Sequence, residues 1–159
     1  MKILVVSDTH RKLENLKVIL EREQPMDLLI HLGDAEGDED SIAEMAGCRL
    51  EIVAGNNDFF SNLPREKELR IGSYRVLITH GHYYYVSAGI ADIEREAAAQ
   101  GYDIVMFGHT HRPVIDYTRE VIALNPGSLS YPRQEGRRPS YIVMDLDKNG
   151  KANFEIKYL

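Results

Sequence analysis

The sequence has one cysteine, no tryptophan and no long apolar run. The single cysteine, Cys48, excludes an intramolecular disulfide and leaves a thiolate metal site without partners, so we expect a packed residue. The apolar stretches span about five to eight residues, far short of the ~20 that a membrane helix needs. The first follows Met1-Lys2 directly and is typical of a strand rather than of a signal peptide. We therefore expect a cytoplasmic protein without a membrane helix.

Basic residues are also in the minority, with 19 against 25 acidic residues and a formal net charge of -6. A protein that tracks nucleic-acid phosphates needs a basic face, so this balance argues against broad nucleic-acid binding. The 159 residues, 43% hydrophobic and 28% charged, have the composition of an ordinary globular protein. No internal repeat or linker divides them, and we expect one domain over residues 1–159.

Short apolar runs alternate with segments of helical periodicity, which indicates an α/β protein. The first five runs are unbroken, as in strands covered on both faces, and comprise residues 3–6, 28–32, 51–54, 75–78 and 104–107. Helices are predicted over residues 13–20, 40–46 and 90–97, the last stopping at Gly101.

The later part of the chain predicts antiparallel strands over residues 114–117, 121–124, 141–146 and 153–158. The last two flank Asp147-Lys148-Asn149-Gly150, and Asn-Gly in this position is a strong hairpin signal. We therefore expect two β-sheets packed face to face as a sandwich, with helices on the outer faces.

Polar residues and glycines follow each of the first five apolar runs, and five of the six histidines lie among them. Ligands bind beyond the carboxyl ends of the strands in α/β sheets, so we expect the five clusters to share one site. The clusters are Asp8-Thr9-His10, Gly33-Asp34, Gly55-Asn56-Asn57-Asp58, His80-Gly81-His82 and Gly108-His109-Thr110-His111.

These clusters contain enough donors for two cations that share one carboxylate. Oxygen and nitrogen donors without thiolate suit Mn²⁺ or Fe²⁺ and tolerate Zn²⁺, Ni²⁺ or Co²⁺, whereas Ca²⁺ prefers oxygen alone. Two divalent ions, two carboxylates and a bridging hydroxide leave about one positive charge, which favours phosphate esters as substrates. The candidate ligands are Asp8, His10, Asp34, Asn56, His80, His109 and His111.

In its order, the series Asp-x-His, Gly-Asp, Gly-Asn, His-Gly-His and Gly-His-x-His over residues 8–111 resembles the calcineurin-like metallophosphoesterase superfamily. The short chain and Asn125-Pro126-Gly127-Ser128 resemble its small bacterial and archaeal phosphodiesterase subgroup. The resemblance implies a four-layer αββα fold of two mixed sheets. It also implies two metal sites: the first with Asp8, His10, Asp34 and His111, the second with Asp34, Asn56, His80 and His109.

Asn57 departs from the pattern of the larger family members, which have a histidine at this position of the third motif. An amide donates a hydrogen bond but delivers no proton at neutral pH, so general acid help worth ~10²–10⁴-fold is missing or comes from elsewhere. We expect Asn57 to orient the phosphoryl group during in-line attack by the bridging hydroxide. The expected substrate is a small phosphodiester with an activated leaving group.

Two other functional classes remain open, as do several individual residues. The retromer subunit of the vacuolar sorting machinery resembles this subgroup and is regarded chiefly as an interaction platform, so a protein-interaction scaffold is one alternative. A nucleotide-binding sensor with little turnover is another. A homo-oligomer is compatible with the enzyme and with both alternatives. Functional and purely structural interpretations both remain for Asp58, His31, His82, residues 83–85, the arginines at 133, 137 and 138, and residues 125–128.

Overall fold

The computed structural model describes residues 1–117 and 119–159. In this part of the chain, ten β-strands form two five-stranded sheets. The first sheet has the order β10-β9-β1-β2-β3, with β1 (Lys2–Val6), β2 (Leu28–His31), β3 (Arg49–Ile52), β9 (Ser140–Leu146) and β10 (Ala152–Tyr158). The second has the order β4-β5-β6-β8-β7, with β4 (Glu66–Ile71), β5 (Tyr74–Thr79), β6 (Ile104–Met106), β7 (Pro113–Asp116) and β8 (Ile122–Pro126).

Both sheets are mixed. Strands β1, β2 and β3 are parallel, and β9 and β10 extend them as an antiparallel hairpin. Strands β5, β6 and β8 are parallel, with antiparallel β4 and β7 at the two edges. The predicted turn closes the β9–β10 hairpin, since the amide of Gly150 donates to the carbonyl of Asp147 (3.0 Å). Gly150 has a φ of 81°, which glycine adopts without strain.

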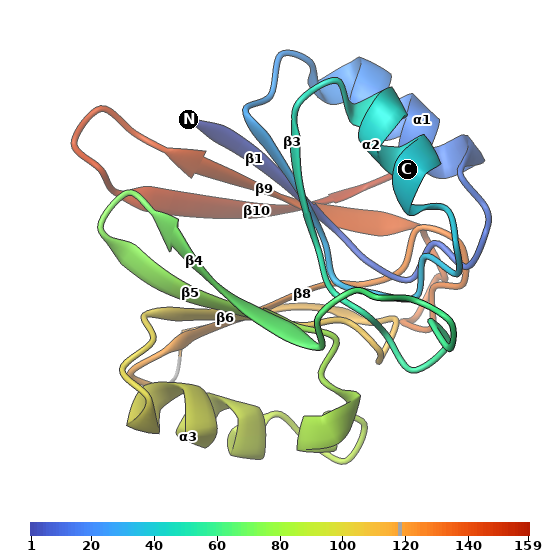
Figure 1. The fold of residues 1–159 in the computed structure, drawn as a ribbon. Helices are drawn as coiled ribbons and strands as arrows, with labels where there is room; N and C mark the ends of the chain where they lie inside the picture. The colour runs from blue at the N-terminus through green and yellow to red at the C-terminus, as the bar shows by residue number, and fades with distance from the viewer. Residues whose placement is uncertain (118) are drawn as a thin grey trace.

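Helices cover the outer face of each sheet, as Figure 1 shows. Helices α1 (Glu14–Glu23) and α2 (Glu39–Ala46) pack on the first sheet, and α3 (Ala91–Ala99) packs on the second. The predicted sandwich with outer helices is therefore confirmed. Helix α3 ends as expected, with Gly101 in the left-handed region (φ 77°) just beyond it.

The apolar core follows the alternation of side chains along the strands. In β1, Ile3 and Val5 point between the two sheets, whereas Leu4 and Val6 face the helices on the outer side. Because both faces of β1 are buried, its sequence is continuously apolar. Cys48 is a free, half-buried residue that packs against the core beneath α1 and α2, as expected.

Strand β4 is the element that the sequence patterns did not predict. Its sequence is mostly charged, and only Leu69 and Ile71 are buried. It lies at the edge of its sheet, where charged side chains discourage pairing with another chain. Strand β3 is also an edge strand. It begins two residues before the predicted start, and the apolar pattern misses this start because its first residue, the exposed Arg49, is charged. Among the described residues, no helix has the length and apolarity to cross a membrane.

A buried carboxylate at the end of α1 supports the fold away from the strand ends. Glu23 is 2% exposed and bonds to Lys2 (2.7 Å), to Lys157 (3.1 Å) and to the hydroxyl of Tyr141 (2.8 Å). Burial alone would raise its pKa, but Lys2, Tyr141 and Lys157 outweigh burial and lower the pKa from 4.5 to about 2. The resulting stability is present above pH 4.5 and is lost as the pH falls towards 2.

We expect Glu23→Gln to lower the free energy of unfolding by about 3 kcal/mol at pH 7, because the ion pairs are lost. The difference from the wild type should shrink below pH 4.5, where the carboxyl group takes up a proton in the unfolded chain first. Urea unfolding followed by circular dichroism at a series of pH values measures both effects. Glu155→Gln is the control, since Glu155 is exposed and 3.9 Å from Lys157. An equal loss at every pH would contradict the titration argument.

Candidate metal centre

The loops that follow five strands converge at one edge of the sandwich. Asp8, Asp34 and Asn56 follow β1, β2 and β3 of the first sheet, whereas His80 and His109 follow β5 and β6 of the second. Each loop therefore starts from a buried strand, which fixes the position of its polar side chains. Their convergence places donors that are up to about 100 residues apart in the chain within hydrogen-bonding range.

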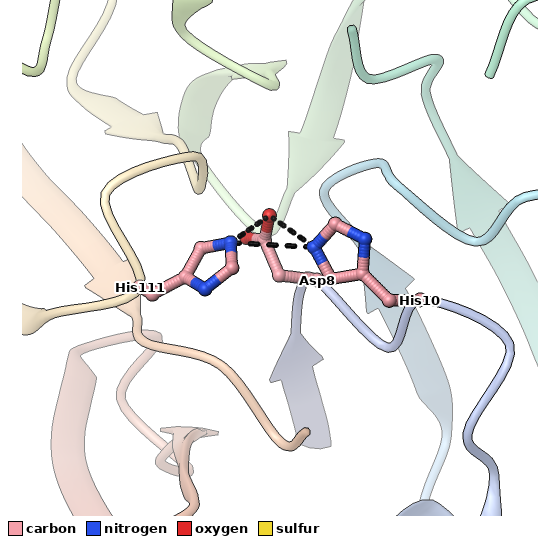
Figure 2. A group of neighbouring side chains, drawn as sticks. All are labelled: Asp8, His10 and His111. Atoms are coloured by element: carbon pink, nitrogen blue, oxygen red, sulfur yellow. Dashed lines mark hydrogen bonds and ion pairs between the residues drawn. The ribbon is translucent and has the colours of Figure 1, made fainter. Parts of the chain in front are cut away.

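Asp8 lies at the centre of this cluster and is fully buried. One of its oxygens, Oδ2, accepts hydrogen bonds from the hydroxyl of Ser7 (2.6 Å) and the amide of His109 (3.1 Å). The other, Oδ1, lies 3.0 Å from Nε2 of His111, 3.6 Å from Nε2 of His10 and 3.8 Å from Nε2 of His80. Figure 2 shows His10 and His111 pointing towards this carboxylate from two sides.

The second carboxylate, Asp34, connects the two halves of the cluster. Its Oδ2 lies 3.7 Å from Nε2 of His10 and 3.4 Å from Nε2 of His80. On the far side, Oδ1 of Asn56 lies 3.0 Å from Nε2 of His80 and 2.9 Å from Nδ1 of His109. All seven side chains singled out as candidate ligands thus meet in one place.

Hydrogen bonds at the outer ring nitrogens orient three of the histidines. Nδ1 of His111 donates to the carbonyl of Tyr131 (2.7 Å), and Nδ1 of His80 donates to the carbonyl of Leu32 (2.6 Å). Nδ1 of His10 is 2.7 Å from Oε1 of Glu36. Partners of this kind fix the tautomer and leave Nε2 for a metal, as is common around metal-binding histidines. Sequence reasoning missed Glu36, because nothing in its local pattern distinguishes it from a surface carboxylate.

The arrangement of unshared electron pairs fits a bound cation. Nδ1 of His111 is occupied by the carbonyl of Tyr131, and its Nε2 lies 3.0 Å from Oδ1 of Asp8. Oδ1 is buried and has no hydrogen-bond donor among the described residues. Nε2 of His10 and Nε2 of His111 are also only 3.3 Å apart. Nitrogen and oxygen atoms this close together share either a proton or a metal ion.

The ionisation of the cluster also favours a bound cation. Burial favours the neutral form of Asp8, but His80, His10 and His111 hold its pKa well below the usual value. Burial likewise opposes ionisation of Asp34, but His80 and Asn57 lower its pKa to about 2. Both carboxylates are therefore ionised at neutral pH. Burial lowers the pKa of His10, yet the carboxylates of Asp8 and Glu36 raise it to about 9. The site attracts positive charge.

Backbone conformation also singles out these loops. Positive φ is rare for residues other than glycine and costs energy, so a concentration of such residues marks functional loops. Of nine in the described chain, six lie at the cluster: Asp8, His10, Asp34, Glu36, His109 and His111.

Asn57 contacts one of the two carboxylates of the cluster. Its side-chain amide donates to Oδ2 of Asp34 (2.8 Å) and its backbone amide donates to Oδ1 (2.9 Å). The side chain is half-buried and borders the groove beside the cluster. Asn57 therefore holds Asp34 in position, and its role in orienting a phosphoryl group stays a prediction.

Asp58 ties two of the ligand loops together. Its Oδ2 accepts hydrogen bonds from the amides of Asp34 (2.8 Å) and Gly55 (2.7 Å), and its Oδ1 accepts one from Glu36 (2.7 Å). The orienting interpretation of Asp58 thus agrees with the structure. His31 is packed and hydrogen-bonded: the amide of Gly33 donates to its Nδ1 (3.2 Å), and Nε2 lies 3.0 Å from the hydroxyl of Thr9.

We expect Asp58→Asn to lower the thermal midpoint and to weaken Mn²⁺ binding about 10- to 100-fold, because one oxygen replaces two as acceptor for three amides. Thermal unfolding and calorimetric Mn²⁺ titration measure the two effects. Asp38→Asn provides the control, since Asp38 precedes α2 and makes no side-chain cap bond. Unchanged Mn²⁺ affinity in Asp58→Asn would show that the loops hold their positions without this carboxylate.

The segment Asn125 to Ser128 supports the cluster from beneath. The amide group of Asn125 donates to the carbonyl of Gly108 (2.8 Å) and to the hydroxyl of Thr110 (3.0 Å). The hydroxyl of Ser128 donates to the carbonyl of Asp8 (2.8 Å). Both side chains are fully buried. They hold the first and last ligand loops, a role that the sequence indicated only as a turn near the site.

His82 and the three tyrosines that follow it have different environments. His82 begins a short 3-10 helix (His82–Tyr84), and burial together with His80 and His109 lowers its pKa to about 4. Tyr84 packs against the core beneath α3, as the structural interpretation expected, whereas Tyr83 and Tyr85 are exposed.

A sandwich of two mixed sheets that gathers aspartates and histidines from five strand ends defines a metal-dependent phosphoesterase fold. The chain matches the Calcineurin-like phosphoesterase superfamily domain over residues 1–149. It belongs to this superfamily, and the resemblance inferred from the motifs is confirmed.

Individual relatives support the assignment. The chain is 34% identical to the probable metallophosphoesterase YsnB of Bacillus subtilis (strain 168), over 94% of this chain and 86% of that protein. It is 28% identical to phosphodiesterase YfcE of Escherichia coli (strain K12), over 92% of this chain and 89% of that protein.

Solved structures share the whole fold. A predicted phosphoesterase from Streptococcus pneumoniae TIGR4 superposes with a TM-score of 0.82 at 28% identity, covering 99% of this chain and 88% of that one. Wild-type Vps29 from Entamoeba histolytica, complexed with zinc, superposes with a TM-score of 0.78 at 20% identity, covering 99% of both chains. The second likeness concerns the fold alone.

Proposed function

We propose that the protein is a phosphodiesterase that uses two divalent metal ions, with Mn²⁺ preferred and Fe²⁺, Ni²⁺, Co²⁺ or Zn²⁺ as substitutes. The observation that carries the proposal is the meeting of seven oxygen and nitrogen donors around two buried carboxylates. Asp8, His10, Asp34 and His111 would hold the first ion. Asp34, Asn56, His80 and His109 would hold the second. The phosphodiesterase name of the relative YfcE favours diesters as substrates.

Asp34 is suited to the shared position because its Oδ2 faces His10 of the first set and His80 of the second. Asp8 faces histidines of both sets as well, through Oδ1. Bound ions supply an activated water and neutralise charge that develops on the phosphoryl oxygens. The protein supplies fixed positions for them, since five of the seven donors lie on strained backbone that the surrounding loops hold.

Neither Asn57 nor His82 replaces the missing proton donor. Asn57 carries an amide, and His82, with a pKa of about 4, is neutral at pH 7 and has no proton to spare for a leaving group. The proposed substrates are therefore small diesters whose leaving group departs without a proton. A cytoplasmic location is proposed with this activity.

The scaffold alternative rests on likeness of fold to Vps29, and fold does not fix function. A scaffold has no need to retain a complete ligand set. Here every predicted donor is present and points into the same cluster, which favours an enzyme.

Hydrolysis assays with the Mn²⁺-loaded protein test the proposal. We expect bis(p-nitrophenyl) phosphate to be cleaved faster than p-nitrophenyl phosphate, and an alkyl diester to be cleaved at least ~10²-fold more slowly than the aryl diester, because an alkoxide leaves poorly without a proton. EDTA should abolish the activity and added Mn²⁺ should restore it. Absence of hydrolysis of every ester with Mn²⁺ present would end the proposal.

A further inference from the structure

A groove of about 840 Å³ opens beside the candidate metal centre. His10, His111 and Asn57 border one side of it, so the groove is continuous with the proposed metal cluster. Three arginines border the remainder: Arg112, Arg133 and Arg137. A molecule bound at the metals would therefore extend into a space lined by three arginine residues.

These arginines have no carboxylate partner in the described part of the chain. Of the nine other arginines in the chain, four form an ion pair with an acidic residue among the described residues: Arg49, Arg75, Arg95 and Arg119. Three unpaired arginines around one groove are notable in a protein with a net charge of -6. Unpaired positive charges brought together in a concave surface attract an anionic ligand.

The one carboxylate that lines the groove is already bound. Oε1 of Glu36 lies 2.7 Å from Nδ1 of His10. Glu36 is therefore already engaged by His10, and none of the three arginines forms an ion pair with it.

The loop that carries two of the arginines is built against the metal cluster. The amide of Arg133 donates to the carbonyl of His111 (3.0 Å), and the amide of Arg137 donates to the carbonyl of Gln134 (3.0 Å). Arg137 has a φ of 44°, in the left-handed region, so the loop holds it in a strained conformation. The next residue, Arg138, lies elsewhere: its Nε donates to the carbonyl of Leu159 and its guanidinium stacks on Tyr158. Of the three arginines close together in the sequence, Arg133 and Arg137 line the groove and Arg138 does not. The third arginine of the groove is Arg112.

We propose that the substrate is a phosphodiester that carries a second phosphate group, and that Arg112, Arg133 and Arg137 bind this second phosphate while the diester lies at the metals. Guanidinium groups bind phosphate oxygens in pairs. A terminal phosphate carries a charge of about -1.5 to -2, which matches several arginines better than the single charge of a carboxylate. The inference rests on the proposed phosphodiesterase function and specifies its substrate class.

Two chromogenic diesters with the same leaving group test the inference: thymidine 5′-(p-nitrophenyl phosphate) with a free 3′-hydroxyl, and the same compound with a 3′-phosphate. We expect the Mn²⁺-loaded wild type to prefer the second at least about 10-fold in kcat/KM, and Arg133→Ala/Arg137→Ala to reduce the preference to about twofold or less. The ratio is insensitive to a general loss of activity. Arg138→Ala, in the same loop but outside the groove, should keep the preference.

A binding measurement decides the inference without turnover. Calorimetry with Mn²⁺ present compares thymidine 3′,5′-bisphosphate with thymidine 5′-monophosphate, and the wild type should bind the bisphosphate more tightly, whereas the double variant should not. Equal affinities and equal kcat/KM values in the wild type, or a preference that survives in the double variant, would overturn the inference. If the wild type cleaves no ester but still prefers the bisphosphate, the proposed function fails and the phosphate site stands.

Discussion

Asp34→Ala is expected to lower phosphodiesterase activity by well over ~10²-fold, because one carboxylate contacts both groups of histidines. Its Oδ2 lies within 3.7 Å of Nε2 of His10 and of His80, so its removal takes a donor from both proposed metal sites at once. The overall fold should persist, since Asp34 lies in a loop and bears no part of the apolar core. Kinetics with bis(p-nitrophenyl) phosphate and circular dichroism measure the two effects.

The same variant should lose the stabilisation that Mn²⁺ gives to the wild type, because a ligand stabilises only the state to which it binds. Thermal unfolding with and without Mn²⁺ reports this directly and needs no turnover. Asp145→Ala, at an exposed position of β9, changes the net charge equally and should behave as the wild type. Retained turnover or a retained Mn²⁺ shift in Asp34→Ala would contradict the shared-carboxylate arrangement.

Gly55→Ala is expected to have an effect of similar size through sterics alone. A Cβ at this position would lie 2.1 Å from Oδ1 of Asp34 and 2.5 Å from its backbone nitrogen. The loops after β2 and β3 must then move apart, which separates Asp34 from Asn56. We expect activity to fall at least ~10²-fold and the free energy of unfolding to fall by about 1–3 kcal/mol, as in other overpacked sites. Kinetics and urea unfolding measure the changes.

Gly37→Ala is the matched control for this substitution. Gly37 has a φ of 93°, so alanine there is strained, but no atom lies within 4 Å of the added Cβ. It should lose some stability and keep most of its activity. Activity in Gly55→Ala at the level of Gly37→Ala would show that the two loops accommodate the methyl group without separating the candidate ligands.

Local sequence signals were sufficient for most of the fold. Buried strands such as β1 and β6 are continuous apolar runs, and Gly101 and Gly150 mark a helix end and a hairpin through their positive φ. Strand β4 was not predicted because it is an edge strand that buries only two side chains, Leu69 and Ile71. Its sequence therefore carries little apolar signal. Antiparallel pairing with β5 holds these residues as a strand, which their own sequence does not predict.

The candidate ligands were predictable because each follows directly on a strand, so strand direction alone brings them to one edge. The residues that hold these ligands in position could not be predicted. Ser128 reaches the carbonyl of Asp8 across 120 positions of the chain, and Glu36 meets His10 across 26. Such partnerships depend on how the two sheets pack. Likewise, nothing local distinguishes Arg137, which lines the groove, from its neighbour Arg138, which does not.

The seven candidate ligands come from both sheets: Asp8, His10, Asp34 and Asn56 from one, and His80, His109 and His111 from the other. Cations bound by ligands from both sheets would cross-link the two sheets and resist sliding of one over the other. Neither layer can assemble the site alone, so capture of metal during folding would have to wait until the sandwich has closed. A newly synthesised chain would therefore bind both metals only once it is folded. Partly folded forms would lack the complete metal site.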